Sequence, residues 1–181
     1  TDMVIAVDDN DCMSLIRLFN EPAGKEFRKK QGVTETVVNN LPLLGISSIS
    51  NLLSAIKFSK YHELTSKDVI LTVFTDSMEL YGSRLEELRQ AHGKYSEHDA
   101  VRDYHSSLLG TKVDHMLELG HYERKRIHNL KYFTWVEQQR KDVDELNAQW
   151  NDYPGYWLKM QSKADEIDRL IEEFNQETGL L

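Results

Sequence analysis

The sequence predicts an α/β fold, with a partial parallel sheet and flanking helices over residues 1–90 and a helical extension over residues 91–181. Residues 3–7 and 69–74 are short, unbroken apolar runs rich in β-branched side chains, the pattern of strands buried on both faces. Each run ends in acidic or hydroxyl residues that can cap a following helix. Beyond residue 91 no convincing strand pattern occurs, and helical spacing dominates.

The helices of the first half follow from apolar spacing and from helix breakers. Residues 8–11 can cap a helix around residues 13–19, which Pro22 and the glycine after it interrupt before another helix begins. An apolar turn at residues 41–46 leads into a largely apolar helix that Ser47 or Ser48 can cap. After the run 69–74, a helix is expected to hold Leu80, Leu85 and Leu88.

Helical signals fill the second half. A long helix is expected over residues 121–139, and the clearest turn lies at residues 152–155. Two Ser-x-x-Asp sequences resemble capping boxes, in which a serine and an acidic residue cap each other's backbone N–H groups: Ser96 with Asp99, and Ser162 with Asp165. An i, i+3, i+4, i+7 stripe follows the second of them, formed by Ile167, Leu170, Ile171 and Phe174.

Composition and charge restrict the classes of function. Of the 181 residues, 40% are hydrophobic and 29% charged, which is typical of a globular protein. The net charge of -8 argues against broad binding of nucleic acid or of an anionic membrane surface. Cys12 is the only cysteine, which excludes an intrachain disulfide and favours a cytoplasmic protein. No apolar run approaches the roughly 20 residues that span a bilayer.

The predicted elements are unbalanced. Two strands against six or more helices is a poor inventory for a self-sufficient parallel sheet, whose strands need partners and cover on both faces. The first strand also begins almost at the first residue. We therefore expect a fragment or a subunit of a split enzyme, completed by a missing N-terminal portion or a partner subunit.

One sequence feature resembles a known enzyme family. Residues 44–48 read Leu-Gly-Ile-Ser-Ser before an apolar helix, and the later apolar run ends in Asp76 and Ser77, followed by Glu79 and Tyr81. These stretches resemble the C-terminal part of the fold-type II pyridoxal-phosphate-dependent enzymes, the cysteine synthase and cystathionine beta-synthase-like family. The resemblance covers about residues 1–88. Ile49-Ser50 replaces the family's usual Gly-Ala, and Met78 stands where glycine is common.

The resemblance implies a function and a cofactor site. It implies a lyase or transferase that catalyses β-elimination or β-replacement on a small amino acid. Ser77 would donate a hydrogen bond to the pyridine nitrogen of pyridoxal 5'-phosphate, Gly45 would let the backbone approach the ring, and Asp76 would adjoin the cofactor. The family's Schiff-base lysine and glycine-rich phosphate loop cannot be identified in this sequence. The chain alone is therefore expected to be inactive, and the complete enzyme to be a homo-oligomer.

Simpler interpretations of the same residues remain open. Ser77 and Asp76 can cap the next helix, and Gly45 can be an ordinary turn glycine. Asp76 after an apolar strand also suggests a haloacid-dehalogenase-type nucleophile, but Met78 occupies the position of the second aspartate in those enzymes. As a whole, the chain could be a non-catalytic α/β interaction or assembly module.

The histidines and one basic cluster complete the survey. The seven histidines show no zinc-binding spacing and are best explained as solvated or packed residues. Residues 121–128 combine Arg and Lys with aromatic side chains and could bind a phosphate or an acidic partner. A solvated helix face is the simpler explanation in an acidic chain. Cys12 is expected to be a small buried apolar residue.

Overall fold

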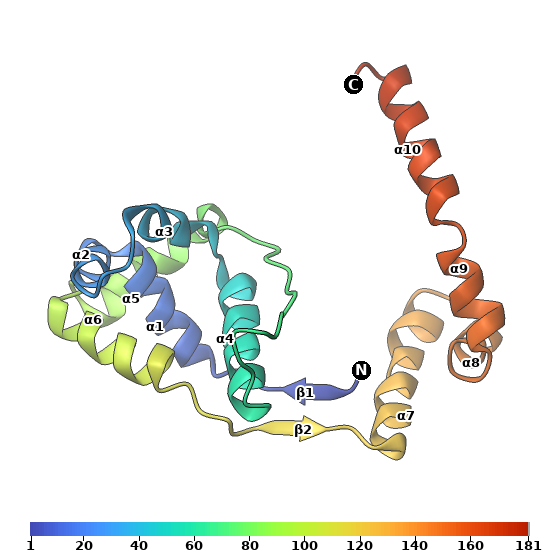
Figure 1. Cartoon of the computed structure of the whole chain (residues 1–181), viewed down its shortest axis with the longest axis horizontal. Helices are drawn as coiled ribbons and strands as arrows, with labels where there is room; N and C mark the ends of the chain where they lie inside the picture. Colours follow the sequence, from blue (N-terminus) through green and yellow to red (C-terminus); the bar gives the residue numbers. More distant parts are fainter. Residues whose placement is uncertain (181) are drawn as a thin grey trace. The chain divides into compact units, whose positions relative to one another are not determined.

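The computed structural model describes residues 1–180, and most of them are helical (Figure 1). The chain divides into two compact units, one formed by Met3–Glu118 and the other by Thr1–Asp2 with the chain from Leu119 onward. The elements of the first unit are β1 (Met3–Ile5), α1 (Asp9–Asn20), α2 (Pro22–Lys30), α3 (Glu35–Asn40), η1 (Leu41–Leu43), α4 (Ile46–Tyr61), η2 (Met78–Tyr81), α5 (Gly82–His92), α6 (Glu97–Asp103), η3 (Tyr104–Leu109) and β2 (Met116–Glu118). Those of the second are α7 (His121–Asn129), η4 (Tyr132–Gln138), α8 (Val143–Asn151), η5 (Tyr153–Leu158), α9 (Lys159–Gln161) and α10 (Ala164–Glu177).

The sheet has two antiparallel strands in the described chain, so the prediction of a partial parallel sheet with flanking helices is wrong. β1 pairs with β2 in the register Met3 to Glu118 and Ile5 to Met116. The first predicted strand does form, over three residues, but its Val4 side chain is 42% exposed. β2 lies beyond residue 91, where no strand was expected, because three residues carry too short a pattern to read.

Residues 69–74, predicted to be a second buried strand, form neither a helix nor a strand in the described structure. Val69 and Leu71 are 91% and 94% exposed. Along this segment the backbone accepts one hydrogen bond, from Asn51 Nδ2 to the carbonyl of Val73 at 2.8 Å. β-Branched apolar residues favour an extended backbone, but a strand also needs a neighbour to pair with, and no described segment provides one.

Most predicted helices of the first unit form, and their ends show why. Asp8 caps α1 by accepting a hydrogen bond from the N–H of Asn10 at 2.8 Å. The expected capping box of Ser96 and Asp99 starts α6. Ser47 or Ser48 was predicted to cap α4, but both lie inside its first turn, and Gly45 occupies the capping position without a side chain to contribute.

Three predictions for the second half are corrected. The helix expected over residues 121–139 is divided between α7 and the π-helical segment η4. Ser162 and Asp165 form no capping box, because α10 begins after Lys163 without a side-chain cap. The predicted turn at residues 152–155 instead begins the helical segment η5, which Asp152 caps.

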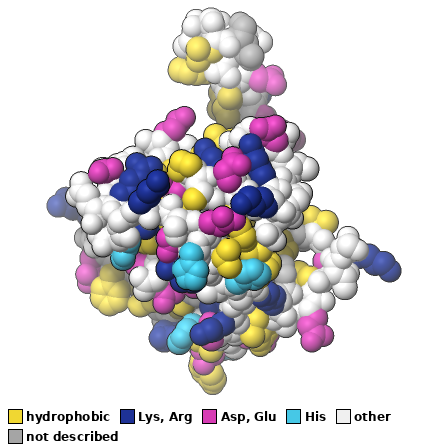
Figure 2. Space-filling model, turned by 90° about the vertical axis from the view of Figure 1, so that its left-hand side faces the viewer, with side chains coloured by type: hydrophobic (Ala, Val, Ile, Leu, Met, Phe, Trp, Pro, Cys, Tyr) yellow, Lys and Arg dark blue, Asp and Glu magenta, His cyan; other side chains and the backbone are white. Residues whose placement is uncertain are grey.

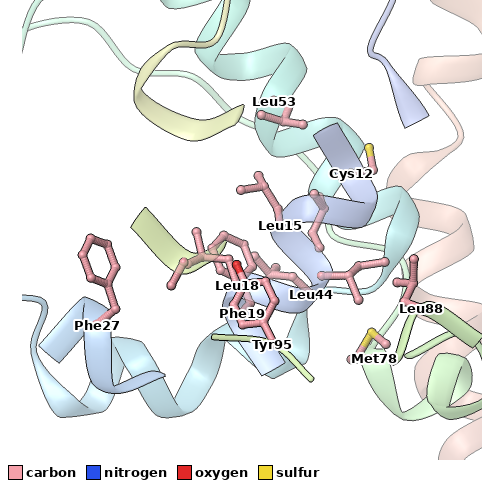
Figure 3. Packing of buried hydrophobic residues seen from close by; sticks show 13 residues of the cluster. Cys12, Leu15, Leu18, Phe19, Phe27, Leu44, Leu53, Met78, Leu88 and Tyr95 are labelled. Carbon is pink, nitrogen blue, oxygen red and sulfur yellow. The ribbon is translucent and has the colours of Figure 1, made fainter. Parts of the chain in front are cut away.

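The hydrophobic core of the first unit is centred on α1. Leu15, Ile16 and Leu18 are fully buried, and Phe19 nearly so. Figure 3 shows Leu15, Leu18 and Phe19 of α1 between residues from α2, α4, η2 and α5. Cys12 is buried in the same cluster, as predicted, and burial raises the pKa of its thiol to about 11, with nearby Asp9 and Asp11 adding to the effect.

A buried arginine joins α1 to α2. Arg28 is 2% exposed, donates to the carbonyls of Phe19 and Gly24, and stacks over the Phe19 ring. Burial lowers the pKa of the Arg28 guanidinium to about 10, so it stays charged at neutral pH. The two helices approach so closely that a Cβ on Gly24 would lie 2.2 Å from the Leu18 carbonyl oxygen. Glycine is therefore required there.

The surface over α2 and α6 carries charges of both signs. Figure 2 shows Lys and Arg side chains interspersed with Asp and Glu on this face, rather than gathered into one patch. The exposed pair of Lys30 and Glu97 joins α2 to α6 at 2.7 Å. Such exposed pairs contribute little to stability, so the contact between these helices depends mainly on apolar packing.

No single helix among residues 1–180 is both long and apolar enough to span a membrane. The helical stretch Glu35–Leu43 and α4 meet that criterion only when taken together, and a bend of 119° separates them. This finding concerns length and composition alone.

Truncating the centre of the core should cost far more than truncating an exposed leucine. We expect Leu15→Ala to lower the free energy of unfolding by about 2–5 kcal/mol, because it leaves a cavity in a fully buried site. Leu80→Ala, at a side chain 73% exposed, is the matched control and should change it by less than about 0.5 kcal/mol. Urea unfolding measures both, and equal losses would contradict this description of the core.

Candidate functional site

The residues that the family resemblance selects meet at the N-terminus of α4. The Asp76 carboxylate accepts hydrogen bonds from the backbone N–H groups of Ser47 at 3.0 Å and Ser48 at 2.8 Å. The Ser48 hydroxyl also donates to this carboxylate, at 2.6 Å, and the backbone N–H of Gly45 donates to the Asp76 carbonyl at 3.0 Å. Asp76 therefore does for α4 what a capping side chain does, from a position 28 residues beyond Ser48.

Position 45 requires glycine because the Asp76 carboxylate and the Tyr81 ring occupy the space that a side chain would need. A Cβ on Gly45 would lie 2.7 Å from Asp76 Cγ and 2.8 Å from Tyr81 Cε2. The Tyr81 hydroxyl donates to Asp76 Oδ2 at 2.8 Å. Asp76 and Tyr81 thus fill the space that opens beside the glycine, and the site is a tightly packed polar cluster.

Asp76 is ionised throughout the physiological range. Partial burial alone would raise the pKa of its carboxyl, but the hydrogen bonds from Ser48, Tyr81 and Ser47 outweigh burial and lower it to about 2. The same contact raises the pKa of the Tyr81 hydroxyl, mainly because the phenol proton is held by the carboxylate. A negative charge at a helix N-terminus is also favoured by the helix dipole.

Ser77 lies directly after Asp76, at the start of η2. Its side chain is half-buried, and its oxygen accepts one long hydrogen bond, 3.4 Å, from the N–H of Glu79. The capping interpretation is therefore correct in part, because Ser77 does cap η2. Within residues 1–180 its hydroxyl has no hydrogen-bond acceptor, which leaves the proton available to a ligand.

Cavities in the first unit lie elsewhere. One cavity, of about 520 Å³, has polar residues in its lining that include Asp11, Lys57 and His115. Lys57 is buried there, where it donates to the Ala6 carbonyl at 2.9 Å and to Asp114 at 3.2 Å. Its amine thus joins α4 to the residue that follows β1 and to a residue shortly before β2. Neither this cavity nor the one of about 290 Å³ includes Gly45, Asp76 or Ser77 among its lining residues.

In the second unit, the ring of Trp150 packs against the basic segment, residues 121–128. Lys125 lies 4.7 Å from the centre of the Trp150 ring, and His128 packs against the same ring. Burial lowers the pKa of His128, whose Nε2 lies 3.0 Å from the carbonyl of Leu146. These contacts favour the packing interpretation of residues 121–128. Among the residues that the structure describes, no three His, Cys, Asp or Glu side chains are grouped closely enough to hold a metal ion.

Replacing Asp76 should weaken the fold at neutral pH. Asp76→Ala removes the acceptor for two backbone N–H groups of α4, and we expect a loss of about 0.5–2 kcal/mol in unfolding free energy. Ser47→Ala is the control, because only the backbone of Ser47 contacts Asp76. Urea unfolding at pH 7 measures the difference, and equal stabilities of the two variants would show that the Asp76 contact contributes nothing.

The contribution of Asp76 should disappear in acid. Because the pKa of this carboxyl is lowered from 3.8 to about 2 in the folded state, its stabilising effect is complete above pH 4 and is lost as the pH falls toward 2. We expect Asp76→Asn to lose less stability than the wild type between pH 4 and pH 2. Unfolding curves across this range measure the slopes, and parallel slopes would contradict the assigned pKa.

The structure thus brings Gly45 and Asp76 into contact and places Ser77 beside them, and the cofactor role of the three residues stays a prediction. The cluster also includes Ser48, which the sequence suggested only as a cap. Comparison of the chain with protein-family models, with curated proteins and with solved structures found no match in any of the three.

Proposed function

We propose that this chain forms part of a pyridoxal-phosphate-dependent lyase or transferase, cysteine-synthase-like, that catalyses β-elimination or β-replacement on a small amino acid. The observation that carries the proposal is the half-buried Ser77 hydroxyl, which has a proton to donate and stands on a turn fixed by Asp76. The chain is inactive alone, since its sequence offers no identifiable Schiff-base lysine or phosphate loop. A cytoplasmic location is part of this proposal and agrees with the single, buried Cys12.

The residues of the turn fit the cofactor in one respect and not in another. Ser77 fits, because a hydroxyl donor is what an unprotonated pyridine nitrogen accepts from. Gly45 does not offer an open wall for the ring, because the Asp76 carboxylate and the Tyr81 ring already occupy the space beside it. The proposed cofactor contact is therefore through Ser77, and Gly45 acts by allowing Asp76 to reach the α4 terminus.

Each residue of the cluster then has a definite task. When bound, pyridoxal phosphate supplies the electron sink for chemistry at the amino-acid α- and β-carbons. Ser77 would hold its proton on the hydroxyl oxygen and donate it in a hydrogen bond to the pyridine nitrogen, which a neutral donor would leave unprotonated. The charged Asp76 carboxylate is bound to the N-terminus of α4 and thereby orients the turn that carries Ser77, so Asp76 is a positioning residue.

The rest of such an enzyme must contact this chain, and segment 69–74 is suited to that contact. It leads directly to the Asp76 turn, exposes its apolar side chains, and leaves most of its backbone groups without partners among the described residues. An additional polypeptide segment could satisfy those backbone groups and cover the side chains. We infer that the missing N-terminal portion or a partner subunit binds here.

The second candidate function is a non-catalytic assembly module. The same exposed segment favours it, because covering 69–74 requires a partner whether or not a cofactor is present. The two candidates differ at Ser77. Only the enzyme needs the proton of that hydroxyl, whereas an assembly module needs no more than its capping oxygen.

Cofactor binding tests the enzyme proposal. The natural gene product that contains this chain is purified with added pyridoxal phosphate, and its absorbance is followed near the violet edge of the visible spectrum. We expect a band from the bound cofactor, and we expect Ser77→Ala to weaken binding about fivefold, the effect of one hydrogen bond. Ser47→Ala is the control. Absence of the band in the wild-type protein would rule out the enzyme and leave the assembly module.

Assembly through segment 69–74 is tested separately. Leu71→Asp changes a side chain that is 94% exposed, so it should alter the unfolding free energy of the chain by less than about 0.5 kcal/mol. It should nevertheless prevent association with the remainder of the protein, measured by co-purification. Leu80→Asp, at another exposed leucine, is the control. If the Leu71 variant assembles as well as the control does, segment 69–74 is not the contact.

A further inference from the structure

The α10 helix presents an apolar face that its own unit leaves uncovered. Ile167, Leu170, Ile171 and Phe174 follow the i, i+3, i+4, i+7 spacing of one helix face. Each is 49–60% exposed, and α10 has no buried residue. A helix of 14 residues is only marginally stable by itself in water. A partner that covers this face would stabilise both the helix and the contact.

The charges beside this face restrict its partner. Six Asp and Glu residues of α10 oppose one Arg, which gives 1 − 6 = -5 for the helix. At 100° per residue, Glu166, Glu173 and Glu177 line one border of the apolar stripe, and Asp168 lies toward the other. Two α10 helices packed on each other would place these carboxylates close together, which is destabilising. The favoured partner surface is apolar and basic.

Such a surface lies on α7 and η4 of the same unit. Tyr122, Leu130 and Phe133 are 83%, 52% and 56% exposed. The exposed Arg126 lies one turn from Tyr122 and supplies the positive charge of this surface. The other two cations of this stretch have partners within the unit, since Arg124 pairs with Asp2 at 3.0 Å and Lys125 packs on the Trp150 ring. We call the surface formed by Tyr122, Arg126, Leu130 and Phe133 the α7–η4 face. It matches α10 in both apolar character and charge.

We propose that α10 of one copy of this chain binds the α7–η4 face of a second copy. The exchange is reciprocal, so a twofold dimer forms with two equivalent contacts, each pairing an acidic apolar helix with a basic apolar face. The proposal needs neither cofactor nor catalysis, and it stands independently of the function assigned to Ser77.

The oligomeric state of the chain as a function of concentration and salt tests the proposal. Sedimentation equilibrium of the wild type should give a dimer whose dissociation constant rises with ionic strength. Leu170→Asp should raise the dissociation constant at least about tenfold, since it places a charge in the contact. Gln176→Lys, on the opposite face of α10, is the control and should leave it within about twofold. Circular dichroism of each variant confirms that α10 remains folded.

Charge exchange distinguishes this contact from any other. Glu166→Lys with Glu173→Lys should weaken the dimer, and Arg126→Glu should weaken it in a separate variant. A protein carrying all three changes restores opposite charges across the contact and should recover most of the affinity. A monomer at every concentration would overturn the proposal, and so would a dimer whose dissociation constant is unchanged by Leu170→Asp. Failure of the combined variant to recover would overturn it as well.

Discussion

The arrangement of the candidate site depends on one carboxylate. Asp76 accepts hydrogen bonds from the backbone N–H groups at the start of α4. It thereby joins its own turn to the turn at Gly45, 31 residues earlier in the chain. These donors lower the pKa of the Asp76 carboxyl because they stabilise its charged form. Gly45 has no side chain because this carboxylate must come so close, and Tyr81 completes the cluster from the far side.

This constraint sets the positions of the neighbouring segments. The backbone of Ser77 is held in place because the residue before it, Asp76, is hydrogen-bonded to the start of α4. Segment 69–74 precedes the same turn in the chain, and the Asn51 side chain of α4 donates one hydrogen bond to its Val73 carbonyl. This apolar segment is kept near α4 by its anchored end, and its side chains are largely exposed.

Local signals in the sequence predicted much of the helical structure. Asp8 and the Ser96–Asp99 pair mark the starts of α1 and α6. Both caps form as expected because capping involves residues only two or three positions apart. The apolar stripe of α10 is likewise correct. Its exposure could not be read from the spacing, because periodicity shows which residues share a face and not what covers them.

Long-range structure was predicted poorly, for physical reasons. Residues 69–74 have the composition of a buried strand, but composition does not reveal whether a pairing strand exists in the same chain. β1 finds its partner more than 100 residues away, in a three-residue strand with no pattern of its own. The proximity of Gly45, Asp76 and Ser77 came from the family resemblance. Spacing did not indicate that Asp76, rather than Ser47 or Ser48, would cap α4.

The most direct test of this account is amide hydrogen exchange at Ser47 and Ser48, measured by NMR in the wild type and in Asp76→Asn. The account predicts slow exchange at both amides in the wild type, because the charged carboxylate holds them. Asp76→Asn should accelerate exchange at these two amides while the α1 core stays protected. Unchanged exchange at Ser47 and Ser48 would show that the Asp76 carboxylate does not organise the site.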